Sequence, residues 1–454
     1  MPAKERKLIA FAHLGEDWAP CGQLTLAEQG PELLASRFAY GLNYLQRPDA
    51  LEVDPVSLGI GSPERVRGRL LLPVHNLTGF GGIRDAAPDS WGRRVIEAKL
   101  KVPANSLPES QYLLHAGSER VGALDVRTGI ADAPTGTTGD VHTLAYLMEA
   151  AERIEAGETV PAHLDPIFMA GTALGGARPK ASVRDESGTL WLAKFQSRND
   201  AFDIPAVECA ALVLARETGL HVPPVATRML GDRRIMMIRR FDRYWLAHDT
   251  RPDASTDLMD APAGGRTERR MGFVSGLTLV GCDETESRTK SYADLAAAVR
   301  RYCHPDAIRA DNEELFKRMV FNIFASNDDD HLRNHGFLWD PRPRLATEPA
   351  LRRLAAPEPR GRALSAPGHR AAGPCCDDRQ RVGRPCDVLH GPGPRMRPDR
   401  RGVAGRAGVE GVVRAVRRRG PRHRQGGDRV PASGRHQYRE YAQAAALTQG
   451  DRGV

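Results

Sequence analysis

The sequence predicts an α+β fold, for three reasons. Residues 1–130 alternate short apolar runs, punctuated by Gly and Pro, with helical patterns at 31–44 and 90–100. Two apolar segments around a polar turn at 185–188 predict a β-hairpin, and helical patterns dominate beyond residue 271. A chain of 454 residues with 41% hydrophobic residues can also bury the cores of two or three domains.

The elements can be placed in chain order. The stretch 128–140, rich in Gly, Thr and Asp, predicts a linker, and 244–270 predicts a polar loop. The remaining expected elements are strands at 8–11, 181–183, 190–195 and 235–238, and helices at 31–44, 90–100, 141–156, from Pro205, over 271–302 and after a cap at Asp311 or Asn312.

The composition is typical of a soluble protein of the cytoplasm. No apolar run approaches the roughly 20 residues that cross a bilayer, and the first 14 residues lack the pattern of a signal peptide. The seven cysteines include no CxxC pair at zinc spacing, as expected of a reducing compartment. We therefore expect a cytoplasmic protein with no membrane partner.

The positive charge is concentrated in the last 114 residues. The chain carries a net charge of +8, to which residues 341–454 contribute +15, with 25 Arg, no Lys and 10 acidic residues, while residues 1–340 contribute −7. This tail also lacks Ile, Phe, Trp and Asn, and Arg, Pro and Gly fill 54 of its positions. Such a composition cannot build a core, so we expect 341–454 to be disordered.

The tail has the composition that GC-rich DNA gives when it is translated out of frame. Residues 345–354 can be encoded so that reading one base later gives Trp-Arg-Leu-Ser-Pro-Arg-Tyr-Asp-Val. Synonymous codons leave freedom, so this reading is compatible with the sequence and not required by it. We expect a frameshift close to Pro341. The alternative is a basic arm that binds nucleic acid, with only Tyr438 and Tyr441 to stack on bases.

A glycine-rich loop precedes the hairpin. Gly175 and Gly176 carry no side chains, so backbone amides could approach phosphate oxygens there. An ordinary turn is the alternative, because Gly forms turns of many kinds.

A lysine and a glutamate follow the loop at a suggestive spacing. Alternation places Lys194 on the opposite strand face from Ala193 and Phe195, and Glu208 follows 14 residues later near the start of a helix. In protein kinases a helix carboxylate holds a strand lysine against the phosphates of ATP. The same pairing is expected here. A solvent-facing lysine and a first-turn glutamate favoured by the helix dipole are the alternatives.

Asp329 and Asn334 lie five residues apart, just after a helix with a broad apolar face. The catalytic base and the magnesium-binding amide of a kinase catalytic loop have this spacing. We therefore expect Asp329 to accept the proton of the attacking hydroxyl, and Asn334 to place its carbonyl oxygen on Mg²⁺. Alternatively, the run of three aspartates simply ends the helix.

Six motifs occur in a fixed order between residues 11 and 339. They are Pro88-Asp-Ser-Trp-Gly-Arg-Arg94, Val121-Gly-Ala-Leu124, Gly175-Gly-Ala-Arg-Pro-Lys-Ala181, Trp191-Leu-Ala-Lys194, Arg240-Phe-Asp-Arg243 and Asn327-Asp-Asp-Asp-His-Leu-Arg-Asn334. With them the chain resembles the HipA-type serine/threonine kinases, the toxins of bacterial toxin-antitoxin pairs. Six motifs in order are far more specific than any one of them.

The resemblance implies a two-lobed, protein-kinase-like fold with an additional N-terminal α+β subdomain. The parts would be this subdomain at 1–130, an N-lobe-like region at 141–243, the start of a mostly helical C-lobe at 244–340, and the tail at 341–454. The C-lobe would be truncated, because the tail replaces its later helices. Asp329 would be the catalytic base, Glu208 the partner of Lys194, and Asn334 a ligand of Mg²⁺. The residues implied in binding ATP are Gly175, Gly176, Ala177, Arg178, Pro179, Lys180, Lys194, Arg239, Arg240, Phe241, His331, Leu332, Arg333 and Asn334.

The resemblance also implies partners. Family members phosphorylate a serine or threonine of a protein, such as an aminoacyl-tRNA synthetase. They are restrained by a small helix-turn-helix antitoxin, so DNA would be met only indirectly, through that antitoxin.

The chain departs from the family pattern in two places. Ala173, beside Thr172, stands where the family often has an autophosphorylated serine. The family's second magnesium-binding aspartate follows the Asn in a segment like Ser-Pro-x-Tyr-Asp, which this chain lacks and the alternative frame contains. We therefore expect this copy to be impaired as a kinase. The competing interpretation is a noncatalytic kinase-fold protein that binds an antitoxin or a nucleotide.

Overall fold

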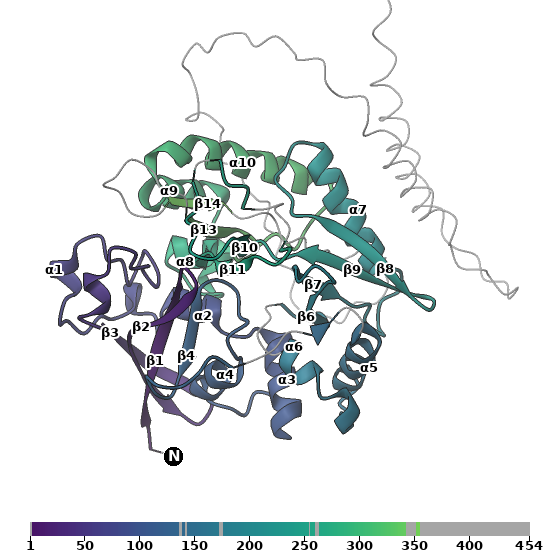
Figure 1. Cartoon of the computed structure of the whole chain (residues 1–454), viewed down its shortest axis with the longest axis horizontal. Helices are drawn as coiled ribbons and strands as arrows, with labels where there is room; N and C mark the ends of the chain where they lie inside the picture. Colours follow the sequence, from purple (N-terminus) through teal and green to yellow (C-terminus); the bar gives the residue numbers. More distant parts are fainter. Residues whose placement is uncertain are drawn as a thin grey trace, which may run out of the picture. The chain divides into compact units, whose positions relative to one another are not determined.

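A computed structural model describes residues 2–135, 139–140, 143–171, 176–253, 255–258, 263–341 and 351–354. Sheets and helices are mixed along this chain, which confirms the predicted α+β class (Figure 1). Within these residues no helix is both long and apolar enough to cross a membrane.

The N-terminal part is built on a four-stranded antiparallel sheet. Its strands are β1 (Lys4–Leu14), β2 (Asp17–Gln29), β3 (Glu32–Tyr40) and β4 (Leu124–Arg127), in the order β3-β2-β1-β4. The helix predicted at 31–44 is wrong, because β3 occupies most of this range. Ser36, Phe38 and Tyr40 are buried at every second position and pair with β2, so two-residue alternation and strand pairing override the helical spacing.

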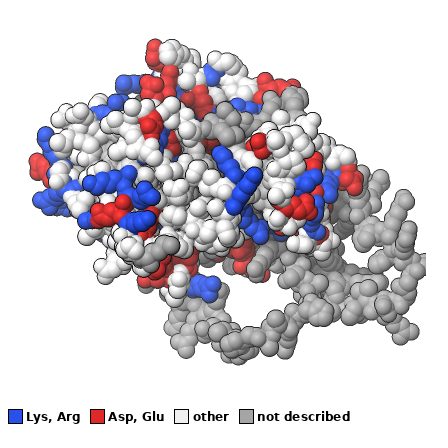
Figure 2. Space-filling view, turned by 90° about the horizontal axis from the view of Figure 1, so that it is seen from below, with Lys and Arg blue, Asp and Glu red and all other residues white. Residues whose placement is uncertain are grey.

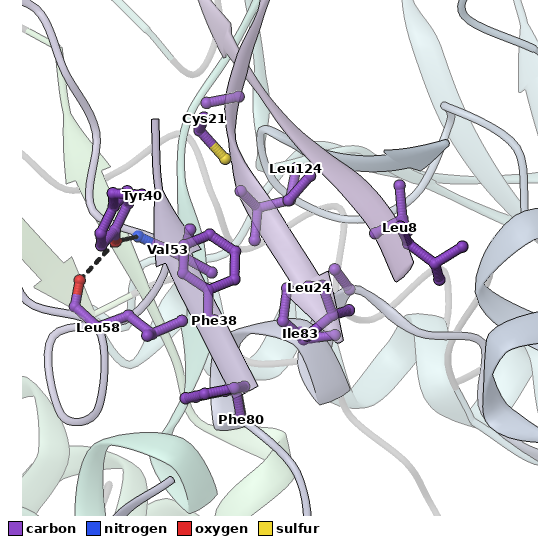
Figure 3. Packing of buried hydrophobic residues seen from close by; sticks show 14 of the residues in the cluster. Leu8, Cys21, Leu24, Phe38, Tyr40, Val53, Leu58, Phe80, Ile83 and Leu124 are labelled. Atoms are coloured by element: carbon purple, nitrogen blue, oxygen red, sulfur yellow. Dashed lines mark hydrogen bonds between the residues drawn. The ribbon is translucent and has the colours of Figure 1, made fainter. Parts of the chain in front are cut away.

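Aromatic side chains fill the core beneath this sheet (Figure 3). Leu24, Phe38 and Phe80 belong to one cluster, in which the Phe38 and Phe80 rings meet edge-on with their centroids 6.1 Å apart. Tyr40 is buried, and its hydroxyl donates to Leu58 O at 2.5 Å. Each large apolar side chain buried here contributes roughly 1.5 to 3 kcal/mol to stability.

A five-stranded sheet forms the middle of the chain, in the order β5-β6-β7-β9-β8. The predicted hairpin, the strand at 235–238 and the helices at 90–100, 141–156 and from Pro205 are confirmed. The α3, α5 and α6 helices pack on one face and α7 on the other. The bounds are β5 (Gly139–Asp140), β6 (Lys180–Arg184), β7 (Leu190–Lys194), β8 (Val225–Leu230), β9 (Arg233–Arg239), α3 (Ser90–Leu100), α5 (Leu144–Glu155), α6 (Ile167–Ala170) and α7 (Ile204–Glu217).

The last described part is mainly helical. It contains α8 (Gly276–Val280), α9 (Tyr292–Tyr302) and α10 (Pro305–Phe324), with the strands β10 (Arg243–Leu246), β11 (Thr267–Arg270), β12 (Phe273–Ser275), β13 (Gly336–Asp340) and β14 (Leu351–Leu354). The short elements are α1 (Pro63–Val66), α2 (Gly81–Ala86), α4 (Glu109–His115) and 3-10 helices at Tyr44–Gln46, Val74–Asn76, Ala162–Leu164, Glu286–Thr289 and Leu332–Asn334.

Three expectations for this part need correction. The ends of the range expected as a loop, 244–270, pair as β10 and β11, with Tyr244 and Trp245 buried. The range expected to be helical from residue 271 opens with β12. The α10 helix begins at Pro305 after His304 as cap, not at residue 311 or 312, because Pro favours the first helical position.

The tail differs from expectation at four residues. Within 341–454, which was expected to be disordered, β14 pairs antiparallel with β13. The edge of β13 offers unpaired backbone groups to such a segment. The other residues beyond Pro341, and Thr172, Ala173 and Gly175, lie outside the described residues.

Candidate active site

Lys194 and Glu208 form a buried ion pair between β7 and α7. Lys194 Nζ lies 3.1 Å from Glu208 Oε2, and the side chains are 7% and 4% exposed. As alternation predicts, Ala193 packs on the opposite face of the sheet from α7. Because α7 starts at Ile204, Glu208 lies beyond the first turn. The ion pair therefore explains its position better than the helix dipole does.

A second lysine lies opposite Lys194. Lys180 on β6 and Lys194 on β7 are paired in register, so their side chains share one face of the sheet. Both are buried. Like charges placed opposite one another repel, so this face favours an anionic ligand such as a phosphate.

Gly176 is the part of the glycine-rich loop that the structure describes. Its φ of +84° is one that side chains rarely adopt. The Gly176 amide donates to Asp89 Oδ2 at 2.7 Å, and its carbonyl accepts from the Trp91 amide at 2.9 Å. One amide expected to face phosphate oxygens is therefore bound by Asp89.

Asn334 closes the loop that starts at Asp329. Its Nδ2 donates to the backbone oxygen of Asp329 at 2.6 Å. Its Oδ1 is buried without a hydrogen-bond partner among the described residues, where an unsatisfied oxygen is costly. The half-buried Asp329 carboxylate makes no hydrogen bond or ion pair within the same residues. Amide oxygens are among the ligands that suit Mg²⁺, so the unsatisfied Asn334 Oδ1 fits the ion.

The neighbouring Asp330 holds the loop in place. Its carboxylate accepts from the Tyr292 hydroxyl, and it lies 3.1 Å from His335 Nε2. Burial alone would raise the pKa of Asp330, but the bonds from His335 and Tyr292 hold it below its ordinary value. A Cβ on Gly276 would lie 2.8 Å from Leu332 O, so α8 needs glycine there to pack against this loop.

Arg333 connects the loop 329–334, which is the expected catalytic loop, to the glycine-rich loop. Arg333 Nη1 donates to Asp89 Oδ1 at 2.6 Å, while Asp89 Oδ2 binds the Gly176 amide. Since both loops reach the same carboxylate, the structure brings them together. Burial alone would lower the pKa of Arg333, but Asp89 and nearby carboxylates raise it.

The side chains of the implied hinge contact protein instead of an open site. Arg239, Arg240 and Phe241 are buried. Arg240 Nη2 donates to Asp242 Oδ2 at 2.7 Å. Burial alone would raise the pKa of Asp242, but the guanidinium groups of Arg240 and Arg243 hold it well below its usual range. Any contact of the hinge with ATP would therefore fall to its backbone.

The other implied residues have mixed surroundings. Arg178 Nη1 binds Asp200 at 2.8 Å, Pro179 O accepts from the Phe195 amide at 3.0 Å, and Ala177 is exposed. His331 is half-buried and Leu332 buried where the last 3-10 helix begins.

Sequence reasoning missed the residues that support the site. Asp89 and Trp91 belong to one of the six motifs, but the motif does not indicate their function. No motif or spacing in the sequence points to Tyr292 or His335. Tyr292 binds Asp330 across 38 residues of sequence and Asp89 binds Arg333 across 244, whereas His335 lies only five residues from Asp330. The pattern of a single sequence does not show contacts at such distances.

Comparison with known protein families finds a match for one segment of the chain. Residues 172–350 match the model of the HipA-like C-terminal domain. Over this segment the chain is HipA-like. For these residues the resemblance to the HipA family that the motifs indicate is confirmed. The search for curated relatives found no match.

Two solved structures are similar to this chain. One is the complex of HipA, HipB and operator DNA from Shewanella oneidensis MR-1, with 15% identity, 77% of this chain and 75% of that chain covered, and a TM-score of 0.47. The other is the proinflammatory kinase CtkA of Helicobacter pylori, with 18% identity, 40% and 54% covered, and a TM-score of 0.27.

Proposed function

We propose that the chain is a HipA-like serine/threonine protein kinase that transfers the γ-phosphoryl group of ATP to a protein. The observation that carries the proposal is the buried pair Lys194 and Glu208, with Lys180 opposite. The glycine-rich loop that leads to Lys180 is linked through Asp89 to Arg333 of the expected catalytic loop. A buried lysine held by a helix carboxylate is the arrangement that aligns ATP phosphates in kinases. The match of residues 172–350 to the HipA-like domain supports the same function.

Each residue of the site has a distinct proposed role. Lys194 and Lys180 bind phosphate oxygens, and Asn334 Oδ1 binds Mg²⁺. When bound there, the ion would supply positive charge that offsets the charge of the phosphates. The acceptor hydroxyl oxygen forms a bond to the γ-phosphorus, the bond to the ADP oxygen breaks, and Asp329 accepts the hydroxyl proton.

The proposed acceptor is a serine or threonine of a protein such as an aminoacyl-tRNA synthetase. We further propose that the chain is the toxin of a toxin-antitoxin pair in the cytoplasm, restrained by a small helix-turn-helix antitoxin that binds DNA. These proposals rest on the order of the six motifs and the HipA-like domain. On the face drawn in Figure 2, Lys and Arg are intermingled with Asp and Glu, which does not favour direct binding of a nucleic-acid backbone there.

A noncatalytic protein that binds nucleotide or antitoxin is the second candidate. It is favoured by the missing Ser-Pro-x-Tyr-Asp segment, which leaves Asn334, a neutral amide, as the implied magnesium ligand of the chain as written. We propose that a frameshift close to Pro341 removed this segment. The match to the HipA-like domain ends at residue 350, shortly after that point.

Replacing Lys194 tests the proposal. Lys194→Ala should weaken binding of Mg·ATP about tenfold or more, because the phosphates lose a charge-assisted partner. The variant should still fold, but with a lower melting temperature, because the buried Glu208 carboxylate loses its partner. Titration with ATP and a melting curve measure the two effects. Lys317→Ala, at an exposed position of α10, is the matched control and should change neither. A lower melting temperature with unchanged ATP binding would show that Lys194 is structural.

A further inference from the structure

The N-terminus of α3 holds an aspartate that does not cap its own helix. Asp89 is the N-cap residue of α3, yet its side chain makes no capping bond. Aspartate is favoured at this position because its carboxylate usually satisfies an amide of the first turn. Here that stabilisation, typically about 1 kcal/mol, is replaced by other contacts.

Asp89 instead binds two segments that are distant in the chain. One oxygen accepts from the Gly176 amide at 2.7 Å, and the other accepts from Arg333 Nη1 at 2.6 Å. The Asp89 and Arg333 side chains are 16% and 24% exposed. Charge-assisted bonds in such a partly buried place are stronger than those of surface ion pairs.

Trp91 reinforces the contact with the glycine-rich loop. Its backbone amide, unsatisfied within the first turn of α3, donates to Gly176 O at 2.9 Å. Its buried indole Nε1 donates to Lys180 O at 2.8 Å. The start of α3 therefore holds both ends of the segment 176–180, which leads into the lysine strand β6.

The contact with the catalytic loop depends mainly on Asp89. Arg333 lies between Asp329 and Asn334 in the chain. Its Nη2 also lies 3.5 Å from a carboxylate oxygen of Glu284, whose side chain is 57% exposed. Such a long, solvated contact adds little.

We propose that Asp89 is a positioning residue, which couples the glycine-rich loop to the catalytic loop by binding Gly176 and Arg333 with one carboxylate. The proposal rests on the proposed kinase function, since it concerns the same site. A residue of the N-terminal subdomain thus sets the distance between the phosphate-binding segment and Asn334. Loss of either contact separates the loops, and ATP then binds less tightly.

Four variants of the full chain separate the contacts. Asp89→Ala removes both, Asp89→Asn retains an acceptor for Gly176 and removes the charge facing Arg333, and Arg333→Gln removes the ion pair from the other side. The fourth combines Asp89→Asn with Arg333→Gln. Glu284→Gln is the matched control, because it removes only the weaker partner of Arg333.

Two measurements are made on each variant, with a melting curve to check folding. Titration with Mg·ATP gives the dissociation constant, and hydrogen exchange reports on the peptides that cover 176–180 and 331–335. We expect Asp89→Ala to raise the dissociation constant about tenfold, or about 1.4 kcal/mol. Asp89→Asn and Arg333→Gln should each raise it by less, and their combination should add nothing further. Exchange in 331–335 should rise in Asp89→Ala.

The other outcomes overturn the proposal. Additive effects of Asp89→Asn and Arg333→Gln would show that the residues act separately. Tighter ATP binding by Asp89→Ala would show that Asp89 competes with phosphate for the Gly176 amide. If the unaltered chain binds no ATP, the kinase proposal fails by itself. The coupling is then decided by exchange alone, and unchanged exchange in 331–335 overturns it.

Discussion

Asp329 and Asp330 are adjacent carboxylates with different surroundings. Asp330 is bound by Tyr292 and His335, whereas the Asp329 carboxylate has no partner within the described residues. A bound carboxylate stabilises the loop, and an unbound one can take up a proton. The structure thus places in different surroundings two residues that the sequence pattern cannot tell apart, and we expect different chemistry from them.

Replacing Asp329 by Asn should remove the base while keeping its shape. We expect phosphoryl transfer by a frame-restored enzyme to fall by about 10² to 10⁴. Asp330→Asn is the matched variant, and it should instead lower the melting temperature because it weakens the bonds to Tyr292 and His335. Unchanged turnover in Asp329→Asn would eliminate the assignment of the base.

His13 predicts a loss of stability in acid. Burial, and then the charge of Arg270, lower the pKa of His13 to about 3 from an ordinary value of 6.5. Between about pH 6.5 and pH 3, His13 is therefore protonated in the unfolded chain and neutral in the folded chain. His13 therefore reduces the free energy of unfolding as the pH falls toward 3, by at most about 1.4 kcal/mol per pH unit.

Melting curves between pH 7 and pH 4 check this expectation. His13→Gln should flatten the decline on the acid side, because glutamine does not titrate. His163→Gln, at an exposed position, should leave the pH dependence unchanged. Equal slopes for the His13 variant and the original chain would show that His13 is not the group responsible.

The sequence predicted the residues whose chemistry is local. Lys194 and Glu208 follow from strand alternation and a short separation, and the structure pairs them. Asp89 could not be predicted in the same way, because its contacts join residues 87 and 244 positions away. Such contacts depend on how helices and sheets pack, which the pattern of one sequence does not contain.

At the scale of elements, the spacing of apolar residues predicts helices and strands well where it follows either the helical repeat or strand alternation, but not both. The α3 helix begins and ends where its pattern does, and the hairpin of β6 and β7 surrounds the expected turn. The error at β3 arose because its apolar residues satisfy both a helical and an alternating pattern. Pairing with β2, which is not local information, decided between them.

The α10 helix leads to a prediction about solubility. Phe316, Ile323 and Phe324 on this helix are 62%, 68% and 73% exposed. Contiguous exposed apolar surface promotes association. Phe316→Glu with Phe324→Lys should therefore reduce self-association of the chain and leave the melting temperature unchanged, as measured by light scattering and thermal unfolding. A drop in the melting temperature would mean that this face is covered within the folded chain.

At the scale of the whole molecule, three clusters of buried apolar residues meet around one site. The N-terminal subdomain contributes Asp89 at the start of α3, the five-stranded sheet contributes the lysines, and the helical part contributes the loop 329–334. Buried arginines and carboxylates join these parts, as at Asp242, whose Oδ2 accepts from the Gly122 amide at 2.7 Å. Removing one partner of such a buried pair is strongly destabilising. The site therefore depends on all three parts at once.

The chain as written should show little or no kinase activity. Transfer would need Mg²⁺ to offset the charge of the phosphates. The second ligand that the resemblance implies is missing from this chain, so Asn334, a neutral amide, would hold the ion weakly. Restoring the reading frame after Asp340 should supply a Ser-Pro-Arg-Tyr-Asp segment, and with it a carboxylate for the ion. ATP turnover and limited proteolysis of the two chains, side by side, provide the comparison. Because the composition of residues 341–454 cannot build a core, we expect early cleavage of the original chain within this tail. Robust phosphorylation by the uncorrected chain, or a protease-resistant tail, would show that the frameshift interpretation is wrong.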